Sequence, residues 1–216
     1  MSRHLPLFID LSDRKVVIFG GGSVGERKAT LFSKHAKVVV VSREFTDGLK
    51  SLEGRVDLVQ VDEIREEVVR SWVAGAFLVI PATSSATLNR MIARVAVSER
   101  ALVNSVDEVS EVIVPSIIDY GEITIAISTS ASSPALSRYI REKLERVITP
   151  EFGEMARLQK ELRKILRRDV KSQRERREIL WEVLNDDAIW EALKESHEKA
   201  WRLAKRYVTK RDVAGS

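Results

Sequence analysis

A glycine-rich stretch near the start of the chain limits what it can fold into more than any other feature. Gly20-Gly21-Gly22-Ser23-Val24-Gly25 follows an apolar run at 16–19 and precedes a helical pattern over 26–34. A buried strand, a G-x-G-x-x-G turn and a helix, in that order, form the context of a dinucleotide-binding fingerprint. The stretch therefore predicts a strand–turn–helix unit with a nucleotide site.

Each glycine of the fingerprint has a physical task. Gly20 permits a tight turn, Gly22 lets the backbone approach a pyrophosphate, and Gly25 lets the helix pack closely on the strand. The phosphates would lie at the helix N-terminus, where unpaired N–H groups and the helix dipole favour an anion. The alternative is a glycine-rich turn without a ligand.

The pattern of the first half predicts an α/β fold with a Rossmann-like parallel sheet. Strands are expected at 16–19, 37–41, 56–61, 77–80 and 102–105, and helices at 26–34, 63–73 and 86–100. In such sheets ligands bind beyond the carboxyl ends of the strands. Four stretches should therefore meet at one edge: Gly20 to Gly25, Ser42 to Glu44, Ala82 to Thr83 and Asn104 to Asp107.

We divide the chain into three parts: a nucleotide-binding domain (1–111), a hairpin and helix (112–149) and a C-terminal helical region (150–216). The hairpin has one apolar face and is too small to be stable alone, so it must pack on a helix or a second subunit. The helix that follows, expected from Pro134 to about residue 148, carries a stripe that should be buried: Leu136, Ile140, Leu144 and Val147. A last helix is expected after residues 185–187.

The net charge of +4 is unevenly distributed. Residues 151–216 contain 17 Lys and Arg against 13 Asp and Glu, and residues 157–177 contain ten basic against three acidic residues. Such a stretch attracts anions, for example nucleic acid, an acidic substrate or an anionic membrane face. A solvated helix surface is the alternative interpretation.

The absence of cysteine excludes disulfides and thiolate chemistry and favours a reducing compartment. No apolar run is long enough to cross a bilayer, and the N-terminal segment does not resemble a signal peptide. We therefore expect a cytoplasmic protein with no membrane partner. The three histidines lack the spacing of a metal site, so no metal is expected.

Three groups of residues could carry chemistry. Asp107 follows the fifth expected strand and could accept the proton that a dehydrogenation releases; a turn-capping aspartate is the alternative. Glu44 would suit the ribose hydroxyl of NAD, whereas Arg43 would suit the phosphate of NADP. The hydroxyl-rich segment 128–133 precedes an expected helix and could bind carboxylate or phosphate, or simply cap that helix.

These residues together resemble the precorrin-2 dehydrogenase family, whose module also forms the N-terminal part of siroheme synthase. The resemblance covers about residues 4–148 and lies in the order and spacing of several short motifs. They are Leu5-Pro6-Leu7-Phe8, Gly20 to Gly25 with Arg27-Lys28, Ala82-Thr83 with Leu88-Asn89, Val103-Asn104 with Val106-Asp107, Pro115 to Ile118, Ala126 to Thr129, Ser133-Pro134 and Arg141 to Glu145.

The resemblance implies NAD-dependent oxidation of precorrin-2 to sirohydrochlorin by a homodimer; some members also insert ferrous iron. It implies that Asp107 is the essential aspartate. It further implies cofactor contacts from Ser23-Val24 and Arg43-Glu44, to which the sheet-edge argument adds Thr83 and Asn104. Ser128, Thr129 and Ser130 would lie near the tetrapyrrole, whose eight carboxylates suit a basic protein.

Two departures and two rival functions accompany the resemblance. The family usually has two glycines where this chain has Ser130-Ala131, and often a small residue other than glycine at position 25. One rival is an NAD(H)-sensing regulator that binds DNA through the basic helices, although no helix-turn-helix is evident and no nucleic acid is expected. The other is an NAD(P) dehydrogenase acting on a different small molecule.

Overall fold

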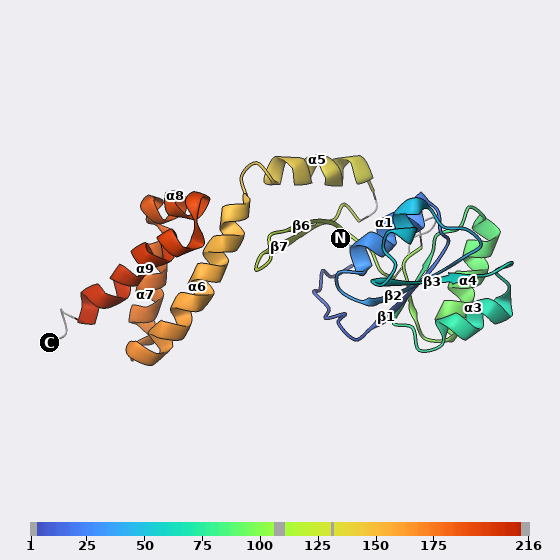
Figure 1. Ribbon diagram of the computed structural model, residues 1–216, viewed down its shortest axis with the longest axis horizontal. Coiled ribbons are helices and arrows are strands. Elements are labelled where there is room, and N and C mark those ends of the chain that lie inside the picture. The colour runs from blue at the N-terminus through green and yellow to red at the C-terminus, as the bar shows by residue number, and fades with distance from the viewer. Residues whose placement is uncertain (1–3, 106–110, 131, 213–216) are drawn as a thin grey trace. The chain divides into compact units, whose positions relative to one another are not determined.

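The computed structural model describes residues 4–105, 111–130 and 132–212 of the chain. It divides into two compact units, of which the first ends at Val114 and the second begins at Pro115 (Figure 1). No helix in the described ranges is both long and apolar enough to cross a membrane.

The first unit is built on a parallel five-stranded sheet in the order β3-β2-β1-β4-β5. Its strands are β1 (Lys15–Phe19), β2 (Lys37–Ser42), β3 (Val56–Gln60), β4 (Leu78–Pro81) and β5 (Leu102–Val103). The predicted Rossmann-like sheet is confirmed. The first strand of the sequence lies at its centre, with Val16 paired to Val38 on one side and to Leu78 on the other.

Helices cover both faces of this sheet (Figure 1). Val16 and Ile18 of β1 belong to the hydrophobic cluster that includes α1 (Ser23–Phe32) and α2 (Asp47–Lys50). The alternate residues of β1 belong to the cluster that includes α3 (Glu66–Val73) and α4 (Ala86–Ser98). Since both faces are covered, the strands are continuous apolar runs.

The element boundaries differ from the expected ones at several positions. The helix after the glycines begins at Ser23, three residues earlier than expected, so that Ser23, Val24 and Gly25 form its first turn. The fifth strand is shorter than expected and ends at Val103. The four-residue helix α2 was not expected at all.

The second unit begins with an antiparallel hairpin of β6 (Ser116–Asp119) and β7 (Thr124–Ile127). Pro115 directly precedes β6, where its missing N–H costs no ladder hydrogen bond. The next helix, α5 (Pro134–Leu144), is capped by Ser133, whose Oγ accepts a 3.2 Å hydrogen bond from the Leu136 N–H. The expected burial of its stripe is wrong within this chain, because no residue of α5 is buried and Leu136 is 48% exposed.

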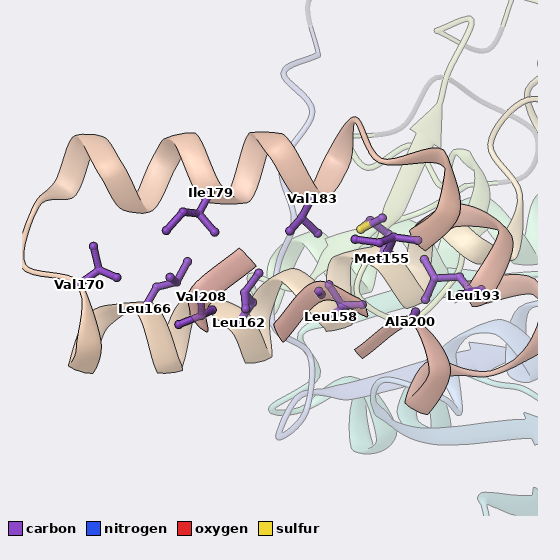
Figure 2. Close-up of a cluster of buried hydrophobic side chains, with 13 residues drawn as sticks. Met155, Leu158, Leu162, Leu166, Val170, Ile179, Val183, Leu193, Ala200 and Val208 are labelled. Atoms are coloured by element: carbon purple, nitrogen blue, oxygen red, sulfur yellow. The ribbon is translucent and has the colours of Figure 1, made fainter. Parts of the chain in front are cut away.

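The remainder of the second unit is a helical bundle. Its helices are α6 (Pro150–Asp169), α7 (Gln173–Leu184), α8 (Asp187–Glu195) and α9 (His197–Asp212). The α6 side chains Leu158, Leu162 and Leu166 lie in one apolar cluster with Ile179 and Val183 of α7 (Figure 2). The single last helix expected after residues 185–187 is in fact two, α8 and α9.

Candidate cofactor site

The glycine loop between β1 and α1 lies at the carboxyl edge of the sheet. Gly20 has a φ of +121°, a conformation that glycine adopts readily, and its N–H donates a 3.0 Å hydrogen bond to the Val41 carbonyl of β2. A side-chain carbon at Gly20 would contact the carbonyl of Ala82, which follows β4. The loop therefore lies between the ends of the two strands that flank β1.

Two hydrogen bonds fix the middle of this loop. The Gly21 N–H donates to Ser42 Oγ over 2.9 Å, and this serine at the end of β2 is buried. The Gly21 carbonyl accepts from the Thr46 N–H over 3.1 Å. Because both main-chain groups of Gly21 have partners, the loop is held in one conformation before any ligand binds.

The N-terminus of α1 faces open space beside the loop. Gly22 is the N-cap residue, and a side-chain carbon built there would meet no atom within 4 Å. The first N–H groups of a helix lack intrahelical partners and carry a partial positive charge. Gly22, Ser23 and Val24 therefore form a cradle that a side chain would fill, and this cradle fits the pyrophosphate of a dinucleotide.

Gly25 brings α1 close to the loop. A side-chain carbon at this position would contact the carbonyl of Gly20. Glu26, in the same turn, accepts a 2.6 Å hydrogen bond from the Thr46 hydroxyl. These contacts fix the start of α1 relative to the loop and to the N-terminus of α2.

Arg43 and Glu44 follow β2 and have exposed side chains that bond to no other described residue. The Glu44 carbonyl lies against Gly21, since a side-chain carbon at Gly21 would contact it. The Arg43 carbonyl accepts from Gln60 Nε2 over 3.1 Å. The main chain of this segment is thus held beside the glycine loop, while both candidate ribose-end side chains are accessible.

Thr83, which follows β4, is fastened to the buried Asn89 of α4. The Thr83 N–H and hydroxyl both donate to Asn89 Oδ1, over 3.0 and 2.7 Å, and Asn89 Nδ2 donates back to the Thr83 carbonyl over 3.1 Å. A side-chain carbon on Gly20 would lie 3.0 Å from the Thr83 nitrogen. The structure thus brings Thr83 to the loop, with its hydroxyl engaged in a protein hydrogen bond.

Asn104, which follows β5, is bonded within the protein through both ends of its amide. Its Oδ1 accepts from Lys28 Nζ over 2.8 Å, and its Nδ2 donates to the Val112 carbonyl over 2.8 Å. Asn104 is buried, and burial lowers the pKa of Lys28 to about 8, with a smaller contribution from the neighbouring Arg27 charge. Asn104 therefore ties α1 to the end of β5.

Sequence reasoning did not identify Lys28, Ser42 and Asn89 as site residues, although Lys28 and Asn89 belong to motifs quoted above. Their task is to hold the loop, Thr83 and Asn104 in place. Asp107, the candidate base, lies outside the described residues.

The predicted substrate segment belongs to the second unit and caps α5. The Thr129 hydroxyl donates to the Ser133 carbonyl over 3.0 Å and lies 3.0 Å from the Ser137 hydroxyl. Ser128 and Ser130 are exposed, and the Ser130 N–H donates to Ser128 Oγ over 3.1 Å. Ser130 has a φ of +52°, which glycine would adopt without strain.

Comparison with known proteins identifies the family. Residues 7–116 match the family described as "Putative NAD(P)-binding". The chain is 50% identical over 203 residues to the precorrin-2 dehydrogenase of Methanosarcina barkeri, covering 92% of this chain and 91% of the relative. This chain belongs to the precorrin-2 dehydrogenase family.

Other members of the family are longer. Siroheme synthases of Actinobacillus pleuropneumoniae and Methylobacillus flagellatus are 35% and 36% identical to this chain. The two matches include 90% and 94% of this chain. It spans only 40% and 44% of those enzymes. The solved structure of SirC, a precorrin-2 dehydrogenase, matches with a TM-score of 0.73 at 21% identity, covering 95% of this chain and 100% of SirC. The structural match shows that the two proteins share a fold.

Proposed function

We propose that this chain dehydrogenates precorrin-2 to sirohydrochlorin with NAD, as a step of siroheme biosynthesis. The observation that carries the proposal is the 50% identity to the Methanosarcina barkeri precorrin-2 dehydrogenase over nearly the full length of both chains. The relatives reported above bear the names of enzymes, which favours the dehydrogenase over a DNA-binding regulator.

The reaction removes a hydride and a proton from the substrate. NAD, when bound, supplies the hydride acceptor, so the protein must supply a group that takes the proton. We assign this task to Asp107. Its support is the resemblance and its position four residues after Val103, the last residue of β5.

We propose that the cradle at Gly22, Ser23 and Val24 holds the cofactor pyrophosphate, while Gly20 and Gly25 give the loop its close packing. Glu44 is proposed to accept hydrogen bonds from the ribose hydroxyls of NAD; its exposed side chain and the position of its main-chain carbonyl beside the loop support this. Arg43 would be the corresponding contact if NADP were used. Thr83 and Asn104 are also proposed to contact the cofactor. They would do so through atoms that are not already hydrogen-bonded within the protein.

We place substrate binding at Ser128, Thr129 and Ser130. Precorrin-2 carries eight carboxylates, which hydroxyl groups and N–H groups near a helix N-terminus can bind. Ser130 stands where the resemblance implies glycine, and its φ of +52° is one that glycine adopts without strain.

We also propose a homodimer in which the hairpin and α5 form the contact. Within one chain Leu136, Tyr139 and Val147 are 48%, 57% and 66% exposed, so one short segment carries three large apolar side chains that the chain itself leaves uncovered. A second copy would cover this area through a self-complementary interface. A cytoplasmic location stays a prediction from the sequence.

Turnover of precorrin-2 tests the proposal. The purified chain is incubated anaerobically with precorrin-2 and NAD, NADP or no cofactor, and sirohydrochlorin formation is followed by its absorbance. We expect oxidation well above the uncatalysed rate with NAD, and slower oxidation with NADP. Nucleotide binding without any acceleration would mean that the fold serves another reaction.

A further inference from the structure

A strongly basic cavity lies between α6 and α7 of the second unit. Its volume is about 230 Å³. Its wall is formed by the apolar side chains of Leu166 and Leu180, by Gln173 and by four arginines, namely Arg163, Arg167, Arg176 and Arg177. We call this cavity the arginine pocket; the dehydrogenase proposal gives it no task.

The arginines converge because of their spacing on two packed helices. Arg163 and Arg167 are four residues apart on α6, so their side chains share one face of that helix. Arg176 and Arg177 follow in the first turns of α7, which packs against the neighbouring apolar face of α6 that contains Leu162 and Leu166. A second cavity of about 360 Å³ along α6 shares Arg163 and Arg167 and extends the basic lining with two lysines.

The arginines of the pocket lack the acidic partners that other arginines of this unit have. Arg138, Arg157 and Arg174 each pair with a glutamate four residues further along their helix, over 2.8, 3.4 and 2.9 Å. No described residue that lines the pocket is acidic.

Within the described ranges, Arg163, Arg167 and Arg177 form no ion pair with a carboxylate. Arg176 is used differently, since it donates to the carbonyls of Val170 and Lys171 over 2.7 and 3.0 Å. Arg163, Arg167 and Arg177 are exposed, so water screens part of their mutual repulsion, and a bound anion would neutralise the positive charge that remains around the cavity.

We propose that the arginine pocket binds a small multivalent oxyanion, of the polycarboxylate or polyphosphate class. Guanidinium groups present planar donor pairs that match both carboxylate and phosphate oxygens. The half-buried Leu180 offers an apolar surface for the body of such a molecule. The volume lies below the roughly 300–1,000 Å³ typical of sites for larger organic ligands, so it suits a compact anion rather than a dinucleotide.

Calorimetric titration of the full chain tests this proposal. Pyrophosphate and tricarballylate serve as probes of the two classes, at constant ionic strength and with NAD present in excess so that it competes for the glycine loop. We expect one pyrophosphate or tricarballylate per chain in this pocket, and the tighter of the two identifies the class. The double variant Arg167→Gln/Arg177→Gln should weaken this binding about tenfold or more, since two charge-assisted contacts are lost.

The matched control removes the same charge elsewhere in the unit. Arg202→Gln/Arg206→Gln changes two exposed arginines of α9 that line neither basic cavity, and it should leave the affinity within about twofold. If both double variants bound the probe equally weakly, the binding would come from general electrostatic attraction and not from the arginine pocket, and the proposal would be overturned. Absence of binding to the unmodified chain would do the same.

Thermal unfolding separates binding from a structural role. Without probe, Arg167→Gln/Arg177→Gln should unfold at the same or a higher temperature than the unmodified chain, because repulsion is removed. With probe, the unmodified chain should gain stability that the variant does not. A variant that is destabilised equally with and without probe would show that the arginines serve the fold and not a ligand.

Discussion

Replacing Gly22 by alanine should weaken cofactor binding without unfolding the protein. Gly22 has φ −83° and ψ −172°, which alanine adopts without strain, and the added carbon would meet no protein atom within 4 Å. Alanine is a poorer N-cap than glycine by about 0.5 kcal/mol. Alanine also lowers the conformational entropy of the unfolded chain, which stabilises the folded state by about 0.4–1 kcal/mol. The free energy of unfolding should therefore change by less than about 0.5 kcal/mol.

The effect of Gly22→Ala on binding should be much larger. The methyl group would occupy the space where the pyrophosphate approaches the first turn of α1. Loss of one charge-assisted hydrogen bond costs about 1.5–3 kcal/mol. This corresponds to an increase of about 10- to 150-fold in the dissociation constant for NAD.

Gly20→Ala is the matched comparison in the same loop. Here φ is +121°, and the new carbon would contact the Ala82 carbonyl. Backbone strain costs about 1–3 kcal/mol, and the steric conflict costs a further amount of about 1–3 kcal/mol. Gly20→Ala should thus lose stability as well as binding.

Both properties can be measured on the same preparations. Calorimetric titration with NAD gives the dissociation constant, and urea unfolding gives the stability. If Gly22→Ala binds NAD as tightly as the unmodified chain, the pyrophosphate does not approach this glycine and the proposed cradle is wrong. If Gly22→Ala unfolded as readily as Gly20→Ala, the space around Gly22 could not be open.

Three further predictions concern the base, the buried lysine and the dimer. Asp107→Asn should keep its affinity for NAD while dehydrogenation, measured spectroscopically, falls by about 10²- to 10⁴-fold; normal turnover would assign the proton to another group. Burial lowers the pKa of Lys28 in the folded protein to about 8 from its ordinary value of 10.5, so between these values the unfolded chain binds more protons and stability rises with pH. Lys28→Met should lack this rise in urea unfolding at several pH values, and parallel profiles for the two proteins would contradict the burial of the amine. Leu136→Glu/Tyr139→Glu should convert a dimer into a monomer by light scattering, whereas a monomeric unmodified chain would refute the proposed interface.

Sequence reasoning located the strands of the sheet well, because a fully covered parallel strand is a short continuous apolar run. Val38 to Val41, all buried, show this clearly. Helix α2 was missed because four residues are too few for a helical period to show. Its signals were local: Thr46, whose hydroxyl accepts from the Leu49 N–H, and the fully buried Leu49 itself.

The cofactor site likewise has a part that the sequence predicts and a part that only the fold reveals. The glycine loop could be predicted because its residues are adjacent in sequence and their spacing has a mechanical reason. Lys28 could not be assigned its task, because its partner Asn104 lies 76 residues away and only the fold brings them together. The apolar stripe of α5, none of which is fully buried within one chain, was predicted as buried because periodicity identifies an apolar face but not the molecule that covers it.

The central place of β1 has a consequence for biosynthesis of the chain. β1 leaves the ribosome before both of its neighbours. Val16 cannot pair with Leu78 until that residue, 62 positions later, has been synthesised. At about 5–20 residues per second, one side of this apolar strand lacks its partner for about 3–12 s. During that time β1 is an unprotected strand edge, open to pairing with another nascent chain. Slow translation before residue 78 should therefore lower the yield of folded protein more than slow translation after residue 103, when the last strand of the sheet has been made.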